Sequence, residues 1–272
     1  MASNTALQRS MMGAVLWALA SIASAGTISG QGDALEAAQR AYYNARYDDA
    51  AALTLEPCLT AGDIGACELR TAALLFQIKR ALGDQVDKEK AWKQCVPCRE
   101  WGVAFEAALT RGQTLARARL TAHPDDQATR FLLGKLDLNF VWLYLGTLGR
   151  KTGWSEYWEA RKTLDEVLKR DPTHVRARVA RGWIDYIVDT RMPRGTRWLL
   201  GGGNKKRGLL AIRQAAEADA DFFTRVEARF ALWDMQVREK DFPAAVVTAR
   251  TLVTDFPENQ ELNRFLATHD SR

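Results

Sequence analysis

Four cysteines carry the clearest potential for chemistry in this sequence. Cys95 and Cys98 form a Cys-x-x-Cys pair at the start of a predicted helix, where the positive end of the helix can lower the pKa of a thiol. That pattern suits thiol–disulfide exchange, but the strand–helix context of thioredoxin-like proteins is not visible around it. A c-type haem would need a histidine directly after the pair, where the chain has Arg99.

The cysteines also allow two other interpretations. Cys58 and Cys67 complete an even set of four in the first third of the chain, and four thiolates match the ligand count of a zinc site. In an oxidising compartment they would form disulfides instead. We predict structural disulfides between Cys58 and Cys67 and between Cys95 and Cys98, because short loops close easily; other pairings stay open.

Acid–base chemistry has little support. Asp185 and Asp189 lie one helical turn apart, and such a pair can move protons. More often, carboxylates in this position pair with neighbouring arginines such as Arg181 or Arg191. No two histidines have the spacing of a metal-binding helix face, and no Gly-x-Ser-x-Gly sequence occurs. We therefore predict that the protein is not an enzyme and uses no cofactor or metal.

A glycine turn precedes another predicted helix. Gly201, Gly202 and Gly203 are followed by Asn204 and by basic residues, so free N–H groups at the helix start could bind an anion. The spacing is not that of a P-loop, and no strand precedes it as in a dinucleotide fingerprint. The alternative is a tight turn with Asn204 near the helix cap, and the sequence does not decide between the two.

Aromatic residues and arginines gather in the central third of the chain. Tryptophan, tyrosine and arginine dominate binding hot spots, so they could line a groove for a partner, or a pocket for an apolar ligand with an anionic group. Core packing between helices is the alternative for part of them. The candidate binding residues are Trp142, Tyr144, Trp154, Trp158, Trp183, Tyr186, Arg194, Arg197 and Trp198.

These residues must be positioned by helices, because the chain carries a repeated helical sequence pattern. An amphipathic run ends at or just before a proline at Pro124, at Pro172 and at Pro257, and a new apolar-periodic run follows each time. The spacing fits a repeat of about 34 residues once insertions at 142–154 and 190–204 are set aside. Both insertions fall between the two helices of a pair, so we expect them on the same edge of a stack.

This repeated pattern resembles the tetratricopeptide repeat, which has small residues where paired helices cross and a proline at the end. The matching positions are Leu133, Gly134, Ala160 and Pro172, then Gly182 and Ala211, then Leu232, Ala245 and Pro257, and more loosely Ala50. The resemblance implies an all-α, tetratricopeptide-like solenoid of helix pairs with insertions between the helices of the central pairs. We predict one such domain over residues 26–272; a generic helical bundle is the alternative.

A shorter segment has a second resemblance. Residues 198–210, from Trp198 through the glycines into an alanine-rich helix, are similar to an insertion in the T-component of TRAP transporters. Those are periplasmic helical-repeat proteins that associate with a solute-binding subunit. The family is typically lipid-anchored, and this chain has no cysteine at the expected processing point.

The N-terminus has the pattern of a targeting segment. Arg9 precedes a short apolar run over residues 11–22, and Ala23-Ser24-Ala25 provides a signal-peptidase site before Gly26. The run is shorter than the roughly 20 residues of a membrane-spanning helix. We predict a signal peptide over residues 1–25, no stable membrane anchor after cleavage, and a periplasmic or secreted protein.

Charge and fold together indicate a binding function. The net charge of +5 comes from interspersed charges of both signs, which gives no reason to expect a nucleic-acid partner. We predict an exported scaffold that presents a concave face to another envelope or secreted protein. One alternative is a periplasmic accessory subunit of a solute transporter that binds a small apolar or anionic molecule. The other is a thiol–disulfide oxidoreductase that uses Cys95 and Cys98.

Overall fold

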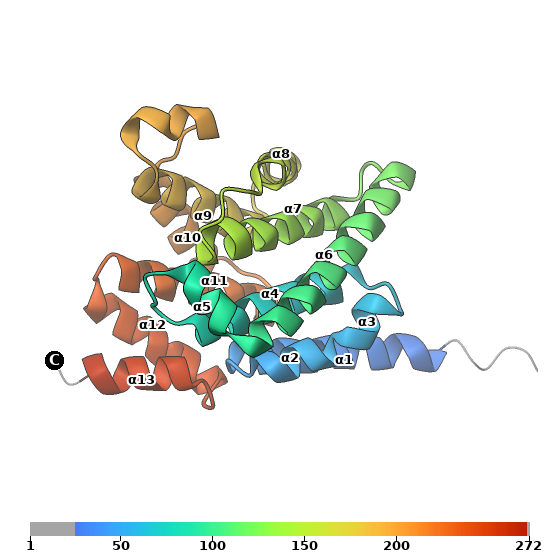
Figure 1. Ribbon diagram of the computed structural model, residues 1–272, viewed down its shortest axis with the longest axis horizontal. Coiled ribbons are helices and arrows are strands. Elements are labelled where there is room, and N and C mark those ends of the chain that lie inside the picture. The colour runs from blue at the N-terminus through green and yellow to red at the C-terminus, as the bar shows by residue number, and fades with distance from the viewer. Residues whose placement is uncertain (1–24, 271–272) are drawn as a thin grey trace, which may run out of the picture.

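The structure is a computed structural model that describes residues 25–270, and all regular elements in that range are helical (Figure 1). In chain order they are α1 (Ala25–Tyr43), α2 (Tyr47–Leu53), α3 (Leu55–Leu59), α4 (Ile64–Leu82), α5 (Lys88–Gln94), α6 (Val96–Ala122), α7 (Gln127–Val141), the π-helical η1 (Trp142–Thr147), α8 (Trp154–Arg170), α9 (Val175–Arg191), the 3₁₀-helical η2 (Arg194–Leu200), α10 (Lys205–Glu217), α11 (Phe222–Arg238), α12 (Phe242–Asp255) and α13 (Gln260–His269).

Side-chain caps explain where several helices begin. A helix start leaves backbone N–H groups without partners, and a short polar side chain can accept from them. Asp63 accepts from the N–H of Ala66 at the start of α4, and Asp126 accepts from the N–H of Thr129 at the start of α7. His174 takes the same role at the start of α9.

The three prolines of the repeated sequence pattern mark equivalent junctions. Helix α6 ends at Ala122, α8 at Arg170 and α12 at Asp255, and in each case a proline follows two residues later. Proline cannot donate a backbone hydrogen bond and resists continuing a helix. Each junction joins the second helix of one pair to the next element of the stack, as the sequence predicts.

Glycines allow the paired helices to approach closely. A Cβ atom on Gly134 would lie 2.7 Å from Thr163 Oγ1 and 3.5 Å from the carbonyl oxygen of Ala160, so α7 crosses α8 where the sequence predicts. A Cβ atom on Gly208 would lie 2.5 Å from the carbonyl oxygen of Gly182.

The second crossing differs from the expectation. We expected Ala211 to face Gly182, but Gly208 takes that position at the crossing of α9 and α10. Because α10 begins directly after the glycine turn, its first turn already meets α9. Ile212, which is fully buried, packs beside the crossing.

The pairs stack in the order of the chain. The pairs are α1 with α2, α4 with α6, α7 with α8, α9 with α10, and α11 with α12, and α13 packs on the last. Each second helix also contacts the first helix of the next pair, as in α6 with α7 and α8 with α9. The insertions η1 and η2 lie between the helices of the two central pairs. The predicted all-α solenoid of helix pairs is confirmed.

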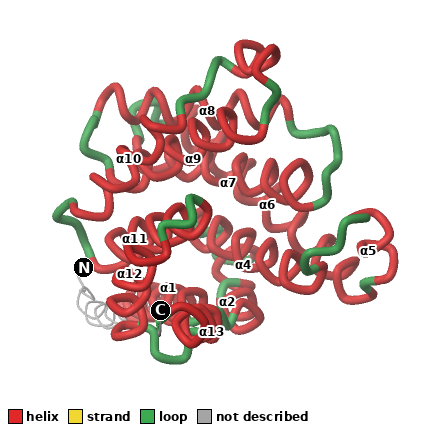
Figure 2. Tube along the Cα trace, turned by 90° about the vertical axis from the view of Figure 1, so that its left-hand side faces the viewer, coloured by secondary structure: helices red, strands yellow, loops and turns green. Residues whose placement is uncertain are grey.

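The stack closes on itself instead of staying open. Its last helices lie beside its first ones at the bottom of both Figure 1 and Figure 2. Asn259 Nδ2 donates to the carbonyl oxygen of Tyr43 at 2.7 Å, and the ring of Tyr43 lies 5.2 Å from that of Phe230. Two exposed ion pairs join the same ends, Arg46 with Glu258 and Arg80 with Glu261. The chain therefore forms a closed, tightly curved array of helices.

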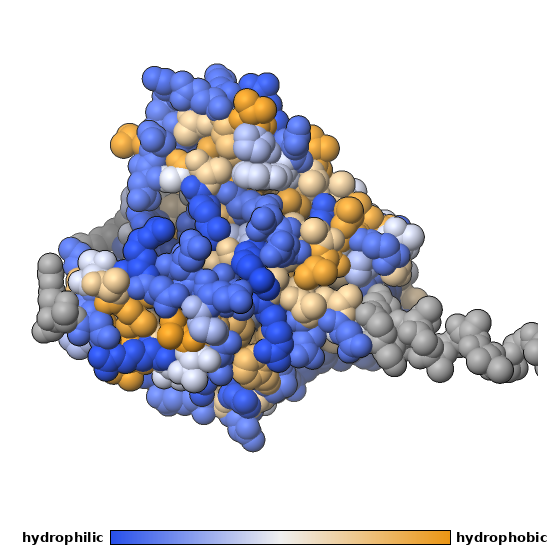
Figure 3. All heavy atoms as spheres, turned by 90° about the horizontal axis from the view of Figure 1, so that it is seen from below, coloured by the Kyte–Doolittle hydropathy of each residue, from blue (hydrophilic) through white to orange (hydrophobic). Residues whose placement is uncertain are grey.

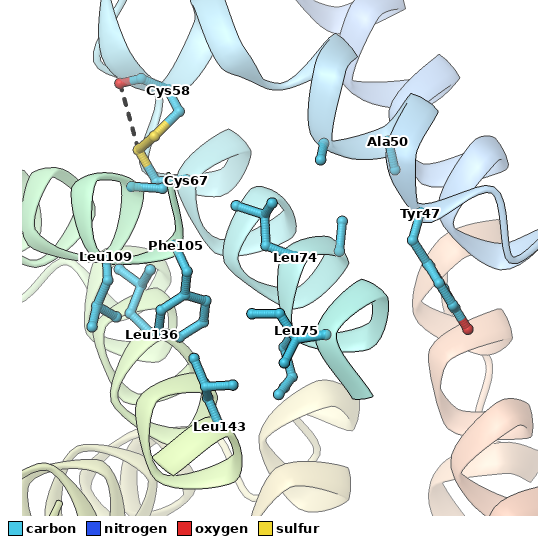
Figure 4. Packing of buried hydrophobic residues seen from close by; sticks show 14 of the residues in the cluster. Tyr47, Ala50, Cys58, Cys67, Leu74, Leu75, Phe105, Leu109, Leu136 and Leu143 are labelled. Atoms are coloured by element: carbon cyan, nitrogen blue, oxygen red, sulfur yellow. Dashed lines mark hydrogen bonds between the residues drawn. A yellow bond between two sulfur atoms is a disulfide. The ribbon is translucent and has the colours of Figure 1, made fainter. Parts of the chain in front are cut away.

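The largest hydrophobic cluster lies among α2, α3, α4, α6 and α7 (Figure 4). Cys58 and Cys67 are fully buried in it and form a disulfide between α3 and α4. The side chains that face one another beside this disulfide include Leu74, Phe105, Leu109, Leu136 and Leu143. This cluster anchors the N-terminal half of the stack.

Residues 1–24, and with them nearly all of the predicted signal peptide, lie outside the described residues. Ala25 and Gly26, which flank the expected cleavage point, are the first two residues of α1. None of the helices between residues 25 and 270 is both long and apolar enough to cross a membrane.

Candidate functional site

A cluster of four charges lies where the first helices of the pairs meet. We call it the inner cluster: Glu68 of α4, Lys135 of α7, Arg176 of α9 and Glu227 of α11. Lys135 Nζ lies 2.8 Å from Glu227 and 3.7 Å from Glu68, while Arg176 lies 2.5 Å from Glu227 and 3.5 Å from Glu68. The cluster joins helices that are not neighbours in the stack, α4 with α9 and α7 with α11.

The charges of the inner cluster stabilise one another. Burial alone would raise the pKa of Glu227, but the cations of Arg176 and Lys135 outweigh it and lower that pKa to about 2. Burial opposes the charge of Lys135 as well, and the two carboxylates raise its pKa overall. Lys135 and Glu227 are therefore charged at neutral pH. The charged groups on the inner side of the stack thus pair with one another, and their side chains are between 7% and 27% exposed.

The candidate aromatic residues do not form one groove. Tyr144, in η1, packs against the large hydrophobic cluster around the Cys58–Cys67 disulfide, and Trp142 packs both against that cluster and against the one formed by α7, α8 and α9. The hydroxyl of Tyr144 donates to the carboxylate of Glu106 in α6, and the guanidinium of Arg150 lies 5.7 Å from the Tyr144 ring centre. This insertion serves as packing for the helices on either side of it.

Trp183 and Tyr186 pack into a different cluster, between α9, α10 and α11. The guanidinium of Arg238 lies 5.2 Å from the ring centre of Trp183. The hydroxyl of Tyr186 donates to Glu239 at 2.8 Å, and burial together with this carboxylate raises the pKa of Tyr186 to about 12. These two residues hold neighbouring pairs together.

The remaining three tryptophans lie on the surface. Trp154 and Trp158, one turn apart on α8, are 41% and 44% exposed, and Trp198 of η2 is 73% exposed. Leu199, next to it, is 53% exposed. Large apolar side chains gathered on neighbouring surface elements often mark an interaction site.

Hydrogen bonds fix η2 beside α8. Tyr157 donates its hydroxyl to the carbonyl oxygen of Leu200 at 2.8 Å. Arg161 donates to the carbonyl oxygens of Leu200 at 3.0 Å, Gly201 at 2.7 Å and Gly202 at 3.2 Å. Both side chains come from α8, so the exposed rings of α8 and η2 lie on adjoining elements.

The two candidate arginines of this insertion are Arg194 and Arg197, and the structure describes the side-chain contacts of the second. Arg197 pairs with Asp189 and donates to the carbonyl oxygen of Met192 at 3.1 Å, so it ties the insertion to the end of α9. Arg194 begins η2, and its side chain lies outside the described part of the chain.

The glycine turn already has an anion at the helix start, and that anion is part of the chain. The Asp189 carboxylate accepts from the N–H of Lys205 at 2.8 Å, and Asn204 caps α10 by accepting from the N–H of Arg207 at 2.9 Å. Asp185 lies against Arg181 and Arg207, each at 2.7 Å. The two aspartates therefore position α10, and the tight-turn interpretation accounts for the glycines.

The cysteines lie in the pairs that the sequence predicts. Besides Cys58 and Cys67, Cys95 is joined to Cys98 at the start of α6, with Cys98 fully buried. No free thiol is found among the described residues. Within the same range, no group of three His, Cys, Asp or Glu residues could hold a metal ion.

One side of α8 presents a row of mostly charged side chains to the surface. We call these residues the α8 stripe: Trp158, Arg161, Lys162, Asp165, Glu166 and Lys169. Asp165 and Glu166 pair with Arg181 and Arg130 from neighbouring helices, while their side chains stay partly exposed. The stripe thus offers an aromatic ring and charges of both signs on one rigid helix.

The inner cluster was not among the candidates from the sequence. A signal for it exists at Glu68, one of two charged residues in the largely apolar first half of α4. Nothing in the sequence indicates that Arg176 and Glu227 would meet this residue, because that contact depends on how strongly the stack curves.

The comparisons with known proteins give little beyond the fold. No protein-family model matches the chain, and no curated protein matches it in sequence. Among solved structures, a thermophilic tetratricopeptide-repeat protein of Thermus thermophilus is similar, with a TM-score of 0.47 and 14% sequence identity. The match covers 87% of this chain and 97% of that one.

Proposed function

We propose that this protein is an exported, non-catalytic scaffold that holds a protein partner on the α8 stripe. The observation that carries the proposal is the contrast between the two sides of the stack. On the inner side the charges of the inner cluster pair with one another, while the α8 stripe presents the half-exposed Trp158 beside charged groups.

The α8 stripe has the physical character of a protein-binding surface. Trp158 supplies a large apolar area with few rotatable bonds, as hot-spot residues do. Lys162 and Lys169 are exposed, and the partly exposed Asp165 and Glu166 lie between them along the helix. Charges of both signs around an aromatic centre favour a partner with a complementary pattern, which sets specificity.

The alternative functions have less support. Trp142, Trp158, Trp183 and Trp198 are divided among separate clusters and the surface, so they do not enclose a ligand pocket. An accessory role in solute transport, with the T-component resemblance, stays a prediction from the sequence. The oxidoreductase alternative also stays a prediction, since a Cys95–Cys98 disulfide is compatible with a structural or a redox role.

The test uses a photo-crosslinking amino acid introduced in place of Trp158 in the full chain. Irradiation in the envelope fraction should yield one defined protein adduct, and unlabelled Trp158→Ala protein should compete poorly for it. The same crosslinker in place of Arg264, an exposed residue of α13, is the matched control. Identical adducts from both positions, or none from position 158, would overturn the proposal.

A further inference from the structure

The η2 insertion has a second surface that the scaffold role does not explain. Both ribbon views show η2 protruding beyond the helix stack, at the top (Figures 1 and 2). Its most exposed side chains are Trp198 and Leu199, at 73% and 53%. We call these two residues, together with the exposed cations Arg191 and Lys206 on either side of them in the sequence, the η2 tip.

The tip is a preformed structure. Arg161 and Tyr157 hold the carbonyl oxygens that follow Leu199, and Arg197 ties the start of the insertion to Asp189. Exposed tryptophan and leucine are thus held out on a fixed support. Since little conformational freedom remains to be lost, binding through the tip carries a small ordering cost.

The indole N–H of Trp198 already has a partner within the tip. It donates to the carbonyl oxygen of Gly195 at 3.0 Å. Moving a tryptophan into an apolar medium normally costs the hydrogen bond that its N–H makes to water. Here that donor stays paired, so the Trp198 ring can enter an apolar environment without leaving an unsatisfied polar atom.

The charged residues of the segment that carries the tip are all basic. From position 190 to position 207 no acidic residue occurs, and the basic residues are Arg191, Arg194, Arg197, Lys205, Lys206 and Arg207. Arg197, Lys205 and Arg207 pair with carboxylates of α9 and of Glu239. Arg191 and Lys206, which flank Trp198 and Leu199 along the sequence, are exposed and form no ion pair within the described residues.

From this combination we infer that the η2 tip docks peripherally on an anionic lipid bilayer. Tryptophan and leucine enter the boundary between headgroups and acyl chains, while lysine and arginine attract anionic headgroups. A protruding apolar tip carried by a basic segment fits such a surface without requiring a partner pocket of matching shape. The opposite face, seen from below in Figure 3, is hydrophilic across its middle with apolar side chains in small groups.

The inference goes beyond the proposed scaffold function, and its test contains no protein partner. The full chain is mixed with vesicles of phosphatidylcholine alone and with vesicles that also contain phosphatidylglycerol, and bound protein is measured by flotation. We expect binding to the second kind only, weakened by added salt. The double variant Trp198→Ala/Leu199→Ala should bind more weakly by on the order of tenfold or more, because most of the apolar area of the tip is gone.

Matched variants distinguish binding through the tip from nonspecific adsorption to the vesicles. Trp198→Phe keeps an aromatic ring and should retain most of the binding, and Val103→Ala, which trims a side chain that is 73% exposed on α6, should change nothing. Arg191→Gln/Lys206→Gln should weaken binding, whereas Arg264→Gln should not. The inference is overturned if the protein binds neither vesicle type, if it binds both equally, or if the double variant binds as well as the original protein. It is also overturned if the protein binds a polyglutamate peptide but not the anionic vesicles.

Discussion

Replacing Glu227 by glutamine would test whether the inner cluster stabilises the closed stack. The substitution keeps the size of the side chain and its ability to accept hydrogen bonds, but removes its charge. Lys135 and Arg176, now 2.8 Å and 2.5 Å from this carboxylate, would be left with Glu68 as their remaining anion. Neutralising one member of a buried charge cluster lowers the free energy of unfolding, because the remaining charges stay buried with fewer partners.

The magnitude follows from the pKa of Glu227, which falls from 4.5 to about 2 in the folded protein. Each unit of pKa corresponds to about 1.4 kcal/mol, so ionised Glu227 contributes about 3 kcal/mol to the free energy of unfolding at pH 7. Since the folded pKa lies below the unfolded one, this stabilisation is present above pH 4.5 and is lost as the pH falls toward 2. At pH 3 about 1 kcal/mol remains.

The assay is urea unfolding followed by circular dichroism at 222 nm, the helix band, at pH 7 and at pH 3. Glu227→Gln should lower the free energy of unfolding by about 3 kcal/mol at pH 7 and by clearly less at pH 3. Glu258→Gln is the control, because Glu258 pairs with Arg46 at 3.2 Å across the same closure but is 60% exposed. Exposed pairs contribute at most about 1 kcal/mol. An equal loss at both pH values, or a loss no greater than that of the control, would refute the reasoning.

Three further predictions concern other parts of the stack. Burial raises the pKa of Asp137, in α7, to about 8, so the folded protein favours the protonated carboxyl. The free energy of unfolding should therefore fall by about 4 kcal/mol as the pH rises from 5 to 8. Asp137→Asn should abolish that fall in urea titrations. Gly208→Ala should lower the melting temperature, because its Cβ would lie 2.5 Å from a backbone carbonyl oxygen. Gly32→Ala, in open space on α1, should leave the melting temperature unchanged or raise it. Replacing Cys58 and Cys67 by alanine should cost about 3 kcal/mol of stability in non-reducing urea unfolding, and an unchanged midpoint would contradict a structural disulfide.

The sequence by itself determined the helix pairs. Periodic apolar runs, prolines two residues past the helix ends and small residues at the crossings are local signals, and α6, α8 and α12 end where the prolines predict. It also indicated the cysteine pairs, since Cys58 with Cys67 and Cys95 with Cys98 are close along the chain. Such features follow from residues only a few turns apart, so no knowledge of the fold is needed.

Only the tertiary structure decided which candidate residues lie on the surface. The sequence grouped Trp142, Trp183 and Trp198 as one candidate site, yet the first packs against two hydrophobic clusters, the second between helix pairs, and only the third lies exposed. The inner cluster likewise joins Glu68 to Arg176 across 108 positions of sequence. The curvature of a solenoid sums small rotations from every helix crossing, and that sum, which no local pattern encodes, determines which face is closed and which is open.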